Sequence, residues 1–270
     1  MKIDVYLAGE ETGFWSSTSE QSFEKSVACV AEHGFDGIEL MTGNLKHTNA
    51  NRIKRIADSQ GLDIVTVASG FIYLRHDLSF THHSSRVRRS AVTKTKACID
   101  FAQRLGARYV SVGLIRGKES EKTPLSLAWR YLVQCIRQCG ELSSSRNVVL
   151  LVEPENRYET GYVHTVEEGV KLIEEVGLDN VRLMIDTFHM NIEESSMRDA
   201  VRRAEGKLAH VHLADSNRLA PGMGHIDFAE VIGALRSIGY NGYLGLEILL
   251  KPTLEVAIEK GMQHIKSILR

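Results

Sequence analysis

Four residues with metal-binding side chains stand near the ends of four successive apolar segments of the sequence. They are separated by 33, 26 and 35 residues and are Glu153, Asp186, His212 and Glu247. Three carboxylates and one imidazole make a mixed oxygen and nitrogen ligand set. Such a set suits Mn²⁺, Co²⁺, Mg²⁺ or Zn²⁺ and leaves coordination positions for the oxygens of a substrate.

Each of these residues alone has an ordinary structural explanation. A Glu after an apolar strand is often a buried ion-pair partner, and a lone His in a strand is more often a hydrogen-bonded core residue than a ligand. The coincidence of all four favours a metal site, because acids at apolar strand ends need a counter-charge that a metal provides.

The four residues are positioned by strand-like and helix-like segments that alternate along the whole chain. Short segments rich in Val, Ile and Leu predict eight strands, at residues 2–8, 36–41, 63–68, 108–114, 148–153, 181–186, 208–213 and 242–248. Continuous apolar runs such as 148–152 are typical of parallel strands buried on both faces. Amphipathic helix patterns follow the strands, for example the capping box of Thr165 and Glu168 before a helix that ends at Gly177.

Eight strand–helix units close a parallel barrel, and 270 residues is the usual size of one. The α/β fold that we predict is therefore a (β/α)8 TIM barrel, with residues 1–270 as a single domain. A doubly wound open sheet is the alternative. No Gly-x-Gly-x-x-Gly follows the first strand, where a dinucleotide-binding sheet needs one.

The bulk composition argues against nucleic-acid or membrane partners. The formal net charge is −1, and no apolar stretch approaches the ~20 residues needed to span a bilayer. We interpret the basic run of Arg86, Arg88 and Arg89 as a solvated helix face. The cysteines are scattered and are expected to be reduced, and Met1–Val5 reads as a strand rather than a signal peptide, so we expect a cytoplasmic protein.

The longest irregular stretches, about 70–84 and 114–124, follow strand ends on the side where barrel enzymes build their sites. Arg75 and Arg116 lie in these stretches. Contact with an acidic substrate is one interpretation of both arginines, and we favour a solvated surface position.

Four motifs around the candidate ligands resemble the signatures of the ketose 3-epimerases. These enzymes are the tagatose/psicose 3-epimerase-like members of the xylose isomerase-like barrel superfamily. The motifs are Glu-Pro-Glu-Asn-Arg-Tyr-Glu-Thr at 153–160, Asp-Thr-Phe-His-Met-Asn at 186–191, His-Leu-Ala-Asp-Ser-Asn-Arg at 212–218 followed by Pro-Gly-Met-Gly-His at 221–225, and Gly-Leu-Glu at 245–247. Their order and spacing extend the resemblance over the whole chain. Segments 73–82 and 114–117 are similar to the branch that includes 5-keto-gluconate epimerase.

The resemblance implies a role for each residue of the set. Glu153, Asp186, His212 and Glu247 would hold a divalent metal ion, with Mn²⁺ favoured. Glu153 and Glu247 would also exchange the proton of the substrate carbon from its two sides. The substrate is implied to be a ketose or keto-sugar acid, and the protein a homodimer or homotetramer. Three further residues are implied to bind the substrate oxygens, namely Glu159, His189 and Arg218.

These residue types suit the implied reaction. Inverting the carbon beside a ketone requires a proton to leave one face and return on the other. Two carboxylates serve as base and acid in either direction, and a divalent ion stabilises the enediolate as a Lewis acid.

Ordinary explanations remain for the residues around the ligands. His189, in a loop after its strand, is also placed to cap a helix; Arg218 is also explained as a surface charge, and Glu159 as a solvated acid. We expect His210 to make a core hydrogen bond. Asp215 is a possible partner that orients a metal ligand.

Three other functions fit the same fold. An aldose–ketose isomerase would use the same metal cage, although the two-metal type needs a further acidic cluster and a catalytic Lys that we do not find. Endonuclease IV-like repair enzymes need more His ligands and a basic groove. A non-catalytic sugar-binding barrel is disfavoured, because both Glu153 and Glu247 are present. The sequence leaves the identity of the sugar open.

Overall fold

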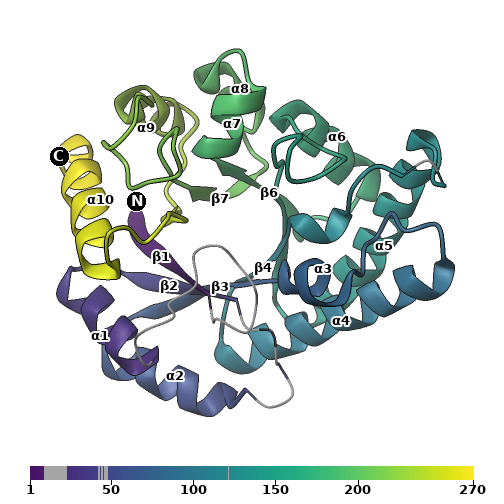
Figure 1. Ribbon diagram of the computed structural model, residues 1–270, viewed down its shortest axis with the longest axis horizontal. Helices are drawn as coiled ribbons and strands as arrows, with labels where there is room; N and C mark the ends of the chain where they lie inside the picture. The colour runs from purple at the N-terminus through teal and green to yellow at the C-terminus, as the bar shows by residue number, and fades with distance from the viewer. Residues whose placement is uncertain (9–22, 42, 44, 46–47, 121) are drawn as a thin grey trace.

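The computed structural model describes residues 1–8, 23–41, 43, 45, 48–120 and 122–270. Eight strands form one closed barrel in the order of the chain (Figure 1). The strands are β1 (Lys2–Ala8), β2 (Gly37–Met41), β3 (Asp63–Ala68), β4 (Tyr109–Val112), β5 (Val149–Val152), β6 (Val181–Asp186), β7 (Leu208–His212) and β8 (Tyr243–Leu246). Every neighbouring pair is parallel, and β1 closes on β8 with Lys2 opposite Tyr243. The predicted (β/α)8 barrel is confirmed.

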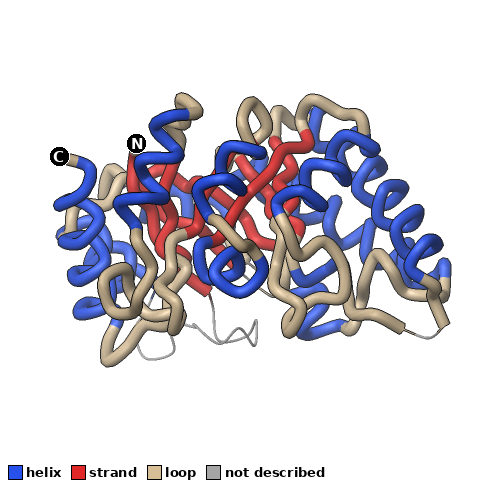
Figure 2. The backbone as a smooth tube through the Cα atoms, turned by 90° about the horizontal axis from the view of Figure 1, so that it is seen from above, coloured by secondary structure: helices blue, strands red, loops and turns tan. Residues whose placement is uncertain are grey.

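Helices surround the strands on the outside, as the blue and red segments of Figure 2 show. The helices of the described residues are α1 (Phe23–Glu32), α2 (Ala50–Ser59), α3 (Phe71–His76), α4 (Ser85–Leu105), α5 (Leu125–Ser145), α6 (Val166–Val176), α7 (Thr187–Glu193), α8 (Met197–Arg203), α9 (Phe228–Ser237) and α10 (Leu254–Leu269), with a short 3₁₀ helix η2 (Leu114–Arg116). The predicted capping box of Thr165 and Glu168 is present at α6, which ends at Gly177 in the left-handed conformation.

Alternate strand residues face opposite sides of the barrel wall, and this separates two apolar clusters. The larger cluster fills the space between the strands and the helices. The smaller one contains Val65, Tyr109, Leu151 and Met184 from four neighbouring strands. Two residues beyond Leu151 and Met184, on the same face of their strands, come Glu153 and Asp186. The barrel interior therefore changes from apolar to acidic toward the carboxyl ends of the strands.

Part of the stretch expected to be irregular is helical. Residues 71–76 form α3 because Phe71 and Ile72 are buried against the barrel, and Asp77 ends the helix in the left-handed conformation. Residues 114–116 form η2. Arg75 is exposed on α3, as expected.

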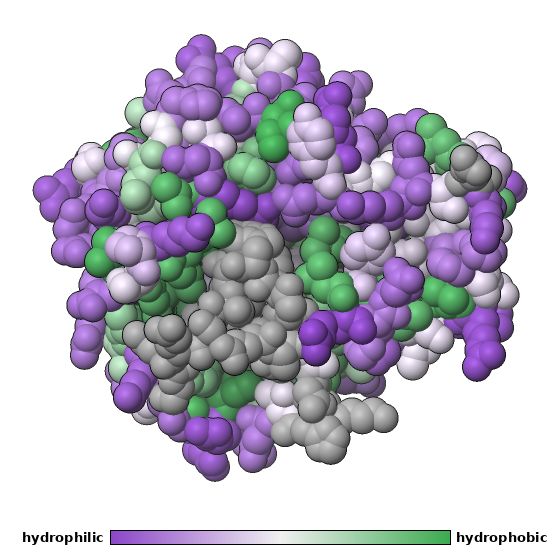
Figure 3. Space-filling model, in the orientation of Figure 1, coloured by the Kyte–Doolittle hydropathy of each residue, from purple (hydrophilic) through white to green (hydrophobic). Residues whose placement is uncertain are grey.

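The face drawn in Figure 3 is mainly hydrophilic, with apolar residues scattered among polar ones. Large apolar side chains that are exposed among the described residues are Leu74, Leu125 and Tyr158. No helix in the part of the chain that the structure describes is long and apolar enough to cross a membrane.

Candidate metal centre and active site

The four candidate ligands lie together at the carboxyl end of the barrel. Asp186 and His212 are the last residues of β6 and β7, while Glu153 and Glu247 directly follow β5 and β8. These four strands are consecutive neighbours and parallel, so their ends open at one mouth. All four side chains are buried.

The carboxylates converge on a common space with two imidazoles beside it. Oxygens of Glu153, Asp186 and Glu247 and one ring nitrogen of His189 all lie within 4.8 Å of one another. Nδ1 of His212 lies 3.5 Å from Oε1 of Glu153 and 3.8 Å from Oε2 of Glu247. The structure therefore brings all four predicted residues together and adds His189 to the group.

Three buried atoms of this group have no hydrogen-bond partner. They are Oε1 of Glu153, Oδ2 of Asp186 and Nδ1 of His212. Buried polar atoms without partners are rare, because each loses the free energy of its contacts with water. A divalent cation satisfies two carboxylate oxygens and an imidazole nitrogen at once, so the residues present fit a metal ion.

His189 is arranged as a hydrogen-bond donor rather than as a ligand. Its Nδ1 accepts from the backbone N–H of Asn156 at 3.4 Å and lies 2.7 Å from Nδ2 of the same residue. A neutral imidazole that accepts at Nδ1 carries its hydrogen on Nε2. Burial lowers the pKa of His189 well below its usual value, and the nearby Arg218 and Arg116 act in the same direction. The sequence placed His189 in a loop, but it lies inside α7.

Burial and mutual repulsion disfavour the charged forms of the carboxylates. Burial raises the pKa of Asp186 to about 6 and that of Glu247 to about 8, and the charge of Glu153 adds to both shifts. Arg218 and His212 oppose the shifts. Packed acids of this kind need a cation to ionise together.

Arg218 bridges two carboxylates at the mouth of the barrel. Its Nη1 donates to Oε1 of Glu159 at 2.5 Å, and its Nη2 donates to Oε2 of Glu247 at 3.0 Å. The guanidinium also lies 4.7 Å from the ring centre of Phe188. The surface position considered for Arg218 is thereby excluded, since the side chain is buried against Glu247 and Phe188.

Asp215 organises the loop that carries Arg218. Its carboxylate accepts from the backbone N–H groups of Ser216, Gly222 and Ile226. The loop holds Arg218 at a positive φ of 60°, a conformation that side chains rarely adopt. The expectation that Asp215 orients a metal ligand is wrong, because its oxygens are occupied by the backbone of its own loop.

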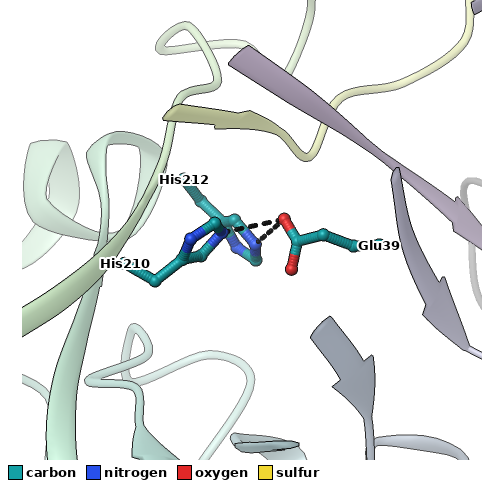
Figure 4. A group of neighbouring side chains, drawn as sticks. All are labelled: Glu39, His210 and His212. Carbon is teal, nitrogen blue, oxygen red and sulfur yellow. Dashed lines mark hydrogen bonds and ion pairs between the residues drawn. The ribbon is translucent and has the colours of Figure 1, made fainter. Parts of the chain in front are cut away.

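Glu39 was not identified from the sequence as part of the site. Its Oε1 lies 2.9 Å from Nε2 of His210 and 2.9 Å from Nε2 of His212 (Figure 4). The core hydrogen bond expected for His210 is present. The available signals were an acid within the apolar strand 36–41 and two His residues on one face of another strand. Nothing in the sequence paired these two strands across the barrel.

Arg116 corrects a second expectation. The sequence favoured a solvated surface position, but the Arg116 side chain is fully buried. It donates to the backbone oxygens of Val112 and Tyr162 and pairs with Glu155. These acceptors come from different strand–helix units, so a local view of the loop does not reveal them.

Comparison with known proteins agrees with this geometry. The family model described as "Xylose isomerase-like TIM barrel" matches residues 27–268. The chain belongs to this family. It is 31% identical to a D-psicose 3-epimerase of Enterocloster bolteae over 255 residues, which cover 92% of this chain and 82% of that protein. It is 34% identical to an L-ribulose 3-epimerase of Mesorhizobium japonicum over 236 residues, covering 86% and 78%.

A solved structure of an L-ribulose 3-epimerase superposes with a TM-score of 0.84 at 27% identity, covering 99% of this chain and 93% of that one. The resemblance to ketose 3-epimerases is therefore confirmed. Another relative in the family, from Escherichia coli, is named a 3-dehydro-D-guloside 4-epimerase and is 27% identical. These relatives are named as epimerases, which are isomerases that act on sugars.

Proposed function

We propose that this protein is a metal-dependent ketose 3-epimerase, which inverts the carbon next to the ketone of a sugar. The observation that carries the proposal is the position of Glu153 and Glu247. Both carboxylates lie beside the unpartnered Nδ1 of His212, at 3.5 and 3.8 Å, on strands that are not neighbours. Epimerisation requires one group that removes a proton from the substrate carbon and another that returns one, and two carboxylates beside the same site can do both.

The side chains have the following roles in the proposal. Glu153, Asp186, His212 and Glu247 hold the divalent ion, and the ion supplies Lewis-acid stabilisation of the charge that develops on the ketone oxygen. Glu153 and Glu247 face opposite sides of the substrate carbon; one removes its proton as base and the other returns a proton as acid, through an enediolate of the sugar.

Three residues position the substrate in this account. Nε2–H of His189 donates to a sugar oxygen, because Asn156 occupies its Nδ1. Arg218 and Glu159 hold each other at 2.5 Å and present a donor and an acceptor to the hydroxyl groups. Arg218 also contacts Oε2 of Glu247, so it restrains the carboxylate that exchanges the proton.

The charge of the site favours a neutral sugar over a keto-sugar acid or a sugar phosphate. The described residues around the ligands include five buried or half-buried acids, which are Glu153, Glu155, Glu159, Asp186 and Glu247. The nearby arginines are both engaged by carboxylates, Arg116 by Glu155 and Arg218 by Glu159 and Glu247. An anionic substrate would meet repulsion that one divalent ion does not remove.

Three further features belong to the proposal. Mn²⁺ is the favoured ion, with Co²⁺, Mg²⁺ and Zn²⁺ as alternatives, and a set of three carboxylates and one imidazole accepts any of them. The protein is expected to work as a homodimer or homotetramer in the cytoplasm.

The test is a product analysis with purified protein, Mn²⁺ and a panel of D-fructose, D-tagatose, L-ribulose and keto-sugar acids. We expect the C3 epimer of at least one neutral ketose. Aldose products would support the isomerase alternative, and C4 epimers would support the activity named for the Escherichia coli relative. Absence of every interconversion with Mn²⁺, Co²⁺ and Mg²⁺ would overturn the proposal.

A further inference from the structure

Behind the candidate metal ligand His212 lies a carboxylate from another part of the barrel. Glu39 comes from β2 and His212 from β7, with β8 and β1 between their strands. Both side chains are buried, and Oε1 of Glu39 lies 2.9 Å from Nε2 of His212. The opposite ring nitrogen, Nδ1, faces Glu153 and Glu247 and has no hydrogen-bond partner. The imidazole therefore stands between Glu39 and the metal-binding group.

We propose that Glu39 is a positioning residue, which holds His212 in the tautomer that leaves Nδ1 able to bind the metal ion. An ionised carboxylate only accepts hydrogen bonds, so the hydrogen of the imidazole must sit on Nε2. The lone pair of Nδ1 is then directed to the site. Carboxylate partners of this kind also fix the ring orientation and raise the basicity of a ligating imidazole. This inference rests on the proposed metal site but not on the reaction or the sugar.

The surroundings of Glu39 hold its carboxylate at this position. His210 lies on the same face of β7 as His212, and its Nε2 lies 2.9 Å from the same oxygen of Glu39 (Figure 4). On the other side is Gly245. A Cβ atom at that position would lie 2.4 Å from Oε1 of Glu39 and 2.6 Å from Oδ1 of Asp4. Glycine at 245 therefore gives the carboxylate the room that it occupies between the two imidazoles.

A second metal ion is the competing explanation for this group. Ligand atoms of Glu39, His210 and His212 lie within 4.8 Å of one another, as they would around an ion. The two distances of 2.9 Å from one oxygen are ordinary for N–H···O hydrogen bonds. The hydrogen-bonded arrangement also leaves His212 one nitrogen for the ion of the main site. We therefore assign hydrogen bonds between Glu39 and the two imidazoles. The number of metal ions bound per chain distinguishes this assignment from a second metal site.

The first experiment measures the tautomer of His212 in metal-free protein by ¹⁵N NMR of labelled histidines, at a pH high enough for the imidazole to be neutral, with the signal assigned through His212→Asn. We expect Nε2 to carry the hydrogen in the unchanged protein. The tautomers should become mixed in Glu39→Ala. A hydrogen on Nδ1 in the unchanged protein, or the same Nε2–H tautomer in Glu39→Ala, would overturn the inference.

The second experiment titrates Mn²⁺ into Glu39→Gln. This variant is nearly isosteric and retains an acceptor oxygen, so it tests the inference even if Glu39→Ala does not fold. We expect Mn²⁺ to bind about 10–100-fold more weakly, with one ion per chain in the unchanged protein. Asp4→Asn is the matched control. Asp4 is a buried acid of the same interior layer, and neither of its oxygens has a hydrogen-bond partner. The Asp4→Asn variant should bind Mn²⁺ as tightly as the unchanged protein does.

Equal losses of Mn²⁺ affinity in Glu39→Gln and Asp4→Asn would overturn the inference. They would show that the loss comes from removing any buried negative charge and not from the contact with His212. Two Mn²⁺ ions per chain, one of them lost in Glu39→Gln, would also overturn it. Neither experiment contains a sugar. A protein that binds Mn²⁺ through Glu39 and His212 but converts no ketose would therefore contradict the proposed function and leave this inference standing.

Discussion

Nη2 of Arg116 lies 3.3 Å from Oε2 of Glu155, and both side chains are buried beside the candidate metal centre. A Cβ atom on Gly113 would lie 2.2 Å from Oε1 of Glu155 and 3.2 Å from Oε2 of Glu153. The two carboxylates thus share the space over Gly113. Burial raises the pKa of Glu155 well above its usual value, with Glu153 adding to the shift and Arg116 opposing it. The positive charge of Arg116 stabilises the ionised form of Glu155 beside the candidate metal ligand Glu153.

Removal of Arg116 is therefore expected to destabilise the protein. In Arg116→Met the hydrogen bonds to Val112 and Tyr162 are lost and Glu155 remains buried without its partner. Loss of one partner of a buried ion pair costs about 3–5 kcal/mol in the free energy of unfolding when the remaining acid stays ionised, and less when that acid takes up a proton. Urea unfolding of the metal-free protein measures this change.

The double variant Arg116→Met, Glu155→Leu is the control, because replacing both charges removes the unpaired acid. It should recover a large part of the lost free energy of unfolding. If Arg116→Met alone unfolds at the same urea concentration as the unchanged protein, the pair does not contribute to the free energy of unfolding and the prediction is wrong.

A separate prediction concerns the loop between Asp215 and Ile226. Asp215→Asn exchanges one carboxylate oxygen for an amide donor, so at least one backbone N–H loses its acceptor. The loop that holds Arg218 should loosen. We expect kcat/KM for the ketose to fall by about 10–100-fold, mainly through KM, because small misplacements of a binding group are costly.

Affinity for Mn²⁺ should change much less than kcat/KM in Asp215→Asn, since Asp215 reaches the ligand Glu247 only through Arg218. The matched control is Asp227→Asn. Asp227 caps α9 by accepting from the backbone N–H of Glu230, and Asn caps helices equally well. Loss of Mn²⁺ binding in Asp215→Asn, or full activity, would refute the assigned role.

The stability of the metal-free protein should depend on pH in a defined direction. Burial raises the pKa of Glu247 from 4.5 to about 8, so between these values the folded state binds more protons than the unfolded state. Stability is then highest below the unfolded pKa and falls as the pH rises toward 8. Thermal unfolding across this range measures the loss.

The same shift predicts how Mn²⁺ acts. Binding requires ionised carboxylates and so displaces protons, which makes affinity rise with pH. The increase in Tm caused by Mn²⁺ should therefore grow from about pH 6 to 8. An increase that is constant over this range would show that Asp186 and Glu247 are already ionised in the metal-free protein.

The barrel and the four strand-end residues followed from local sequence. An apolar run followed by Glu153 or Asp186 marks both a buried strand and the acid at its end, and parallel strands bring such ends together. His189 and Arg218 followed from family motifs. Their hydrogen-bond partners did not, because those depend on side-chain orientation across different loops.

Side-chain contacts between strands that are distant in the chain could not be predicted from the sequence. Glu39 lies 171 and 173 residues from the two imidazoles that it contacts, and no local pattern pairs them. Arg116 was misplaced for the same reason, since a glycine-flanked loop arginine resembles a surface residue until its acceptors are known.

The central claim is that Glu153 and Glu247 exchange the proton of the carbon beside the ketone. The most direct measurement incubates the Mn²⁺-loaded protein with a neutral ketose in D₂O and follows deuterium by NMR. We expect deuterium at C3 of both sugar epimers, and none after chelation or in Glu247→Gln. Epimerisation without deuterium at C3, or undiminished exchange in Glu247→Gln, would contradict the account.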